Sequence, residues 1–91
     1  MAVLHAELHL PESFSLKDKR SVVKSLLQRS AQRYRVSAAE VGLQDDVRRA
    51  RIGVAVVSAS AVHADTVLQE VLRFIAGTYP VEVVSEEVEH R

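Results

Sequence analysis

The residues from Ala2 to Leu10 alternate between two sides, and this pattern most constrains the fold of the chain. One side carries Ala2, Leu4, Ala6, Leu8 and Leu10, and the other carries Val3, His5, Glu7 and His9. A hydrophobic period of two is typical of a β-strand with one buried face. Pro11 has no N–H group to donate, so it ends the strand pairing. The chain therefore begins with a strand that needs an apolar layer on one side.

The hydrophobic period changes to that of an α-helix between residues 15 and 34. Ser15 is a favourable N-cap residue, and Asp18 in the first turn suits the positive end of the helix dipole. The apolar stripe of this helix consists of Leu16, Val23, Leu26, Leu27, Ser30, Ala31 and Tyr34. Spacings of three and four residues place this stripe on one side of a helix, which would cover the apolar face of the first strand.

Three further strands and a second helix complete the pattern. The strands are predicted over residues 36–43, 49–58 and 81–88, and the second helix over residues 61–76, with Gly77 just after its end. The two middle strands form a hairpin, and each helix returns the chain to the same sheet. With right-handed crossovers, the order β-α-β-β-α-β is that of the ferredoxin-like fold, an α/β chain of the α+β type. We expect one domain over residues 1–91, with a four-stranded antiparallel sheet, the first and third strands central, and both helices on one face.

The composition excludes several classes of site. The absence of Cys excludes disulfides, thiolate metal sites and a Cys nucleophile, and a small domain without disulfides is expected in the cytoplasm. The absence of Asn excludes the Arg–Asn pair of acylphosphatases, which share this topology. The three glycines are scattered at positions 42, 53 and 77, so no Gly-rich phosphate loop exists. We therefore expect a protein without catalytic activity or cofactor, and no small-molecule ligand is identified. The alternative is a ligand-responsive or structural homodimer module, in which a carboxylate-bearing effector would bind between subunits.

Two further features bear on where the protein works. The first ten residues lack the basic and apolar regions of a signal peptide. The longest apolar run, residues 52–57, is far shorter than a membrane span of about 18 residues. We expect no membrane association. Arg outnumbers Lys nine to three, and labile Asn is missing, which fits a thermophile, although an Arg bias also arises from genomic base composition.

Basic residues are concentrated between residues 15 and 35, where seven Lys and Arg accompany a single acid, Asp18. A basic helix surface attracts phosphates by releasing counterions. The predicted nucleic-acid contacts are Lys17, Lys19, Arg20 and Lys24 of the helix, extended by Arg48, Arg49 and Arg51 of the hairpin. The expected partner is RNA or a ribosome-associated protein. The alternative is a solvated helix face whose charges pair with Glu residues of neighbouring elements.

The side of the sheet away from the helices, which we call the open sheet face, is a second candidate surface. Its predicted members are Val3, His5, Glu7, His9, Gly53, Ala55 and Val57. None of them is aromatic, so this face cannot stack bases as an RNA-recognition sheet does. Its small apolar residues predict a homodimer contact, with pairing of the short second strand as another route to a dimer. Alternatively, the long loop or an acidic tail with Glu86, Glu87 and Glu89 covers the face.

Two histidines and a carboxylate on the first strand form a third candidate. His5, Glu7 and His9 are spaced two residues apart, so neighbouring side chains project from one face about 6.5–7 Å apart. Imidazole and carboxylate groups are zinc ligands. A fourth ligand is not evident, so metal binding is the weaker alternative and no metal site is assigned.

Several segments resemble the YlxP-like family of uncharacterised bacterial proteins. They are residues 8–11, 15–20 with Val23 and Leu26, 36–41, 53–58 and 71–74. The most specific of them is Ser15–Leu16–Lys17–Asp18–Lys19–Arg20. The resemblance implies a ferredoxin-like fold and no assigned activity. Because genes of this family often lie beside those of ribosome-maturation and translation-initiation proteins, the resemblance also implies an RNA-linked role.

Overall fold

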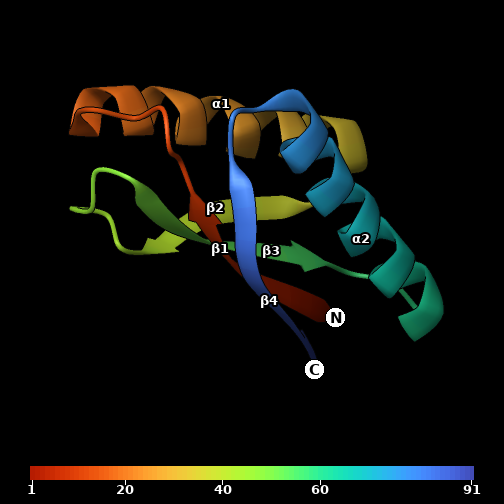
Figure 1. Ribbon diagram of the computed structural model, residues 1–91. Helices are drawn as coiled ribbons and strands as arrows, with labels where there is room; N and C mark the ends of the chain where they lie inside the picture. The colour runs from red at the N-terminus through yellow and green to blue at the C-terminus, as the bar shows by residue number, and fades with distance from the viewer.

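Both helices lie on one side of a four-stranded antiparallel sheet in the computed structural model, which describes residues 1–91 (Figure 1). The elements are β1 (Ala2–His9), α1 (Leu16–Tyr34), β2 (Ser37–Gly42), β3 (Arg49–Val56), α2 (Ala61–Thr78) and β4 (Glu82–His90). The strands follow the order β2-β3-β1-β4, so β1 and β3 are central as predicted. The ferredoxin-like α+β fold expected from the sequence is confirmed.

Successive side chains of β1 alternate between the buried core and the open sheet face. Leu4 and Leu8 are completely buried, whereas His5 and Glu7 between them are half-buried. Burying each leucine side chain contributes about 1.5–3 kcal/mol. The core lies between the sheet and the helices, where buried side chains of β1, β3, α1 and α2 form one apolar cluster.

The end of α2 differs from the prediction. The helix continues two residues beyond Ala76, so Gly77 lies inside it and not at its end. Tyr79 is the C-cap residue and has an extended backbone, with φ −115° and ψ 154°. The helical conformation is unfavourable for a residue that precedes proline. Pro80, rather than Gly77, therefore determines where α2 ends.

The predicted acidic tail is part of the sheet. Strand β4 extends to His90, which pairs with Ala2 at the start of β1. The main-chain N–H of Arg91 donates to the carbonyl of Met1 at 2.8 Å, which closes the ladder at its end. The tail prediction is wrong because β1 offers hydrogen-bonding partners along its whole length. The acidic residues consequently form an edge strand and do not fold over the open sheet face.

The hairpin strands are shorter than predicted. Strand β2 ends at Gly42 because Leu43 adopts a left-handed conformation, with φ 58°. Strand β3 ends at Val56, which leaves Val57 outside the sheet.

Neither α1 nor α2 combines the length and apolar character that crossing a bilayer requires.

Candidate nucleic-acid interface

The start of α1 is determined by the two residues that the sequence indicated. The Ser15 hydroxyl oxygen accepts a hydrogen bond from the main-chain N–H of Asp18 at 3.1 Å. The Asp18 carboxylate in turn accepts one from the main-chain N–H of Phe14 at 3.3 Å. The first bond satisfies an N–H group that a helix start leaves without a partner, and the second fixes the residue before the cap. Asp18 is the only acidic residue in α1, and its carboxylate bonds to the backbone rather than to the neighbouring Lys and Arg side chains.

Lys19 is not a nucleic-acid contact, and this part of the prediction is wrong. Its side chain is 0% exposed. Its Nζ donates hydrogen bonds to three main-chain carbonyls of the hairpin, those of Leu43 at 2.7 Å, Gln44 at 3.1 Å and Arg49 at 3.1 Å. An ammonium group has three N–H donors, so these carbonyls use all of them. Lys19 therefore attaches the first turn of α1 to the β2–β3 hairpin.

Glu40 supplies the negative charge that this buried ammonium needs. Its Oε2 lies 3.1 Å from Nζ of Lys19, and its side chain is 17% exposed. Removing one partner of a buried ion pair leaves an uncompensated charge, which is strongly destabilising. The burial of Lys19 had a signal in the sequence. Lys19 precedes Val23 by four residues and Leu26 by seven, which places it on the buried side of α1.

The other basic residues that were predicted to contact nucleic acid from α1 are accessible to solvent. Lys17, Arg20 and Lys24, which we call the basic stripe, are all exposed. None of them takes part in an ion pair. The main-chain N–H of Arg48 donates to the Asp46 carboxylate at 2.9 Å, but its guanidinium forms no ion pair, and its Nε donates to the carbonyl of Ser13 at 3.1 Å, next to the start of α1. The basic stripe and Arg48 therefore carry charge that no acid of this chain neutralises.

Arg49 and Arg51 do not extend the basic stripe. They lie on the open sheet face, in register with His9 and Glu7 of β1. The carboxylate of Glu7 lies 3.2 Å from the Arg51 guanidinium and 4.0 Å from that of Arg49. The prediction that these arginines join the helix surface is wrong, because the alternation of β3 turns them to the opposite side.

The open sheet face is built as predicted for most of its members. The half-buried residues on it are Val3, His5, Glu7, His9, Gly53 and Ala55. Val57 is 84% exposed and lies beyond the end of β3. The sequence reasoning missed β2, which adds Ala39 opposite Gly53, and Val41, whose Cγ1 lies 3.3 Å from where a Cβ on Gly53 would be. The short β2 carries mostly small residues, so its pattern did not indicate which side faces the helices.

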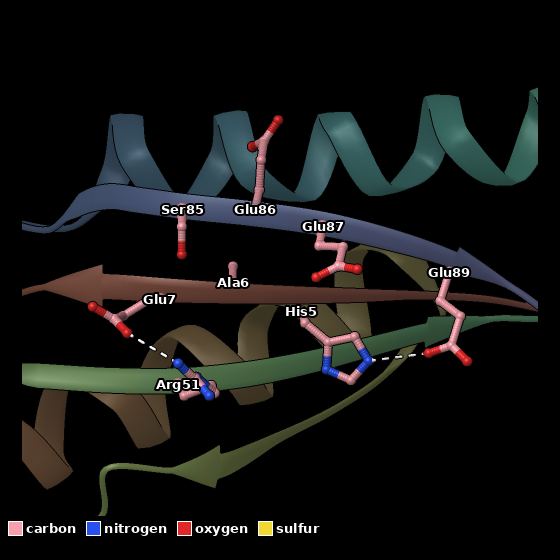
Figure 2. Close-up of a pocket in the computed structure, with 8 residues that line it drawn as sticks. All are labelled: His5, Ala6, Glu7, Arg51, Ser85, Glu86, Glu87 and Glu89. Atoms are coloured by element: carbon pink, nitrogen blue, oxygen red, sulfur yellow. Dashed lines mark hydrogen bonds and ion pairs between the residues drawn. The ribbon is translucent and has the colours of Figure 1, made fainter.

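His5, Glu7 and His9 share a face but contact different partners, and Figure 2 shows this for His5 and Glu7. His5 Nε2 lies 3.6 Å from Glu89, and His9 Nδ1 lies 3.5 Å from Glu82, both on β4. Glu7 is turned towards the arginines of β3. No three His, Asp or Glu side chains of the chain are grouped so that they could hold a metal ion. The structure therefore gives no support to the weaker zinc hypothesis.

An acidic groove of about 430 Å³ runs between β1 and β4 on the side of the sheet shown in Figure 2. Its lining residues are His5, Ala6, Glu7, Arg51, Ser85, Glu86, Glu87 and Glu89. The Arg91 guanidinium donates two hydrogen bonds to Glu89, at 3.0 and 3.2 Å, and holds the pKa of this carboxyl below its usual value. Four of the eight lining residues are glutamates, so carboxylates dominate the charge of this groove.

A family model described as "Protein of unknown function (DUF503)" matches residues 1–88, nearly the whole chain. The chain belongs to the DUF503 family. A relative, the "Uncharacterized protein YlxP" of Bacillus subtilis (strain 168), is 46% identical over 61 residues. The match covers 67% of this chain and 66% of that relative, just under two thirds of its length. The resemblance to YlxP-like proteins is thereby confirmed, and the DUF503 description assigns no activity.

Proposed function

We propose that this DUF503 protein is a non-catalytic, cytoplasmic module that binds RNA, free or within a ribosomal particle, through α1. The observation that carries the proposal is that Lys17, Arg20 and Lys24 are exposed and without acidic partners. On the far side of the sheet, by contrast, the two arginines of β3 share the carboxylate of Glu7. The basic stripe on α1 therefore carries three accessible positive charges that no carboxylate of the chain pairs with.

A fixed row of basic side chains on a helix binds phosphates without reading the nucleotide sequence. Binding releases counterions condensed on the nucleic acid, and this release supplies the free energy of association. Strand β4, which carries the carboxylates, forms one edge of the sheet and contacts α2. Helix α1 contacts β2, which forms the opposite edge, and α2. An RNA backbone can therefore approach α1 without meeting the acidic groove.

The test is a binding titration of the protein with structured RNA at several salt concentrations. If the basic stripe contacts about three phosphates, the slope of log K against log[salt] should lie between about −2 and −3. A slope near zero, or no binding at about 50 mM salt, would contradict the proposal, because counterion release is strongest at low salt.

The open sheet face supports a second candidate function, a structural homodimer. Val3, Gly53, Ala55 and Val41 form a small apolar area that neither helix nor the C-terminal segment covers. Isologous packing of two such faces would bury it. We expect sedimentation or light scattering to show a dimer at high protein concentration, and Ala55→Arg to return it to a monomer. The matched control is Val62→Arg on α2, where Val62 is 77% exposed and lies away from the sheet. A monomer at every concentration would remove this candidate.

A further inference from the structure

All four aromatic side chains of this protein lie around α1, and none lies in the sheet. Each has an arginine guanidinium over its ring. The pairs are Arg48 with Phe14, Arg33 with Tyr34, Arg29 and Arg33 with Phe74, and Arg29 with Tyr79. A guanidinium group within about 6 Å of a ring centroid is attracted to the face of the ring, so all four rings have a cation–π partner.

The larger group lies beside the last turns of α1. Phe74 of α2 meets Tyr34 and Tyr79 edge to face, with ring centroids 5.8 and 6.2 Å apart. The guanidinium carbons of Arg29 and Arg33 lie 5.5 and 5.2 Å from the Phe74 centroid. Edge-to-face packing holds the rings in position, and the rings hold the guanidinium groups.

This group borders a cleft of about 290 Å³, lined by Arg29, Gln32, Arg33 and Phe74. The Tyr79 hydroxyl lies 2.9 Å from the Ser25 hydroxyl, and it accepts a hydrogen bond from Arg29 at 3.3 Å. No carboxylate lines the cleft, and neither arginine takes part in an ion pair. The guanidinium groups are thus oriented while most of their N–H donors remain free.

A smaller group lies at the other end of α1. Phe14 is 74% exposed and stands outside the apolar core. The Arg48 guanidinium carbon lies 5.4 Å from its ring centroid, and the bond from Nε to the Ser13 carbonyl keeps it there. An exposed aromatic ring contributes little to folding, so its pairing with an oriented arginine is better explained by a ligand that stacks on both.

We propose that these two arginine–aromatic groups bind unpaired nucleotides of a single-stranded RNA segment, an inference that rests on the RNA-binding function proposed above. Bases stack on aromatic rings and on guanidinium planes, and free guanidinium donors bind phosphates in pairs. The 19 residues of α1 span about 28 Å. Around the helix, Arg29 and Arg33 lie on the flank towards Phe74 of α2, nearly opposite the basic stripe, so the two groups mark the two ends of α1 and bind nucleotides separately from the basic stripe.

The experiment compares two labelled RNAs, a single strand of about 12 nucleotides and a duplex of similar length, by fluorescence anisotropy. The variants are Phe14→Leu, Phe74→Leu and Arg33→Gln, and the matched control is Val62→Ala, another exposed apolar residue without an arginine partner. Because a stacked base contributes about 1–3 kcal/mol, each Phe variant should weaken single-strand binding about 5- to 150-fold. Duplex binding should change less than about twofold, since duplex bases do not reach the rings.

The outcomes separate this inference from the function on which it rests. Because Phe74 packs against the core, Arg33→Gln tests its group with the ring left in place. Selective loss of single-strand binding in Phe14→Leu and in either variant of the second group supports the inference. Unchanged single-strand binding, or equal loss for both RNAs, overturns it while salt-dependent binding through the basic stripe remains. Failure of the wild type to bind either RNA at low salt overturns both proposals. A mononucleotide that competes as well as the oligonucleotide would also overturn the inference, because it spans only one group.

Discussion

Lys19→Met should lower the free energy of unfolding by about 3–5 kcal/mol, the range for removing one partner of a buried ion pair. The substitution keeps the length and apolar character of the side chain, so the loss is electrostatic. It leaves Glu40 without its counter-charge and removes the donor to three hairpin carbonyls. In a domain of this size, such a loss lowers the melting temperature by roughly 12 °C or more. Urea or thermal denaturation followed by circular dichroism measures it.

Lys17→Met is the matched control, because Lys17 lies in the same turn of α1 but is exposed and unpaired. Exposed substitutions usually change stability by less than about 0.5 kcal/mol. The double variant Lys19→Met/Glu40→Met should recover part of the loss, since it removes both charges. The recovery should be incomplete because the carbonyls of Leu43, Gln44 and Arg49 still lack their donor. Equal stabilities of the two single variants would show that the buried pair does not hold the hairpin to α1.

Neutralising the basic stripe with Lys17→Gln, Arg20→Gln and Lys24→Gln should weaken RNA binding at low salt by about 10- to 1,000-fold. Each neutralised phosphate contributes roughly one decade of affinity at about 50 mM salt, and the triple variant leaves about one to three phosphates without a cation. The slope of log K against log[salt] should become shallower by about one for each of these phosphates. Titration of the same RNA across salt concentrations measures both quantities.

A control of equal charge change is Arg49→Gln, Arg51→Gln and Arg91→Gln, whose side chains are exposed but lie off the helix side. Each triple variant lowers the net charge by three. If both weakened binding equally, the effect would come from overall charge and the interface on α1 would be refuted. Both triples replace surface residues, so circular dichroism should show folded protein in each case.

Much of the fold followed from local patterns. The alternation of β1 placed every second side chain in the core, and Ser15 marked the start of α1 because capping needs only residues three or four positions apart. Element ends were less predictable where a neighbour decided them. Gly77 stayed within α2 because Pro80 sets the end, and β4 extended to His90 because β1 had groups left to pair.

The candidate interface was predicted in part. The sequence correctly indicated that Lys17, Arg20 and Lys24 are exposed, because these positions lie outside the apolar stripe that packs α1 against the core. Lys19 was misassigned because a lysine is rarely buried without a partner, and its partner, Glu40, lies 21 positions away on another element. The arginine–aromatic groups were missed for the same reason, since Phe14 and Arg48 come together only through the β2–β3 hairpin.

The sequence by itself determined the secondary structure, its order and therefore the ferredoxin-like fold, since hydrophobic periods and caps act through backbone geometry over a few residues. Only the tertiary structure decided which charges are used within the molecule and which remain free. Lys19, Arg49 and Arg51 have carboxylate partners, and the basic stripe has none. The reason is physical: an ion pair depends on the distance between side chains, and that distance is set by packing and strand register between segments far apart in the chain.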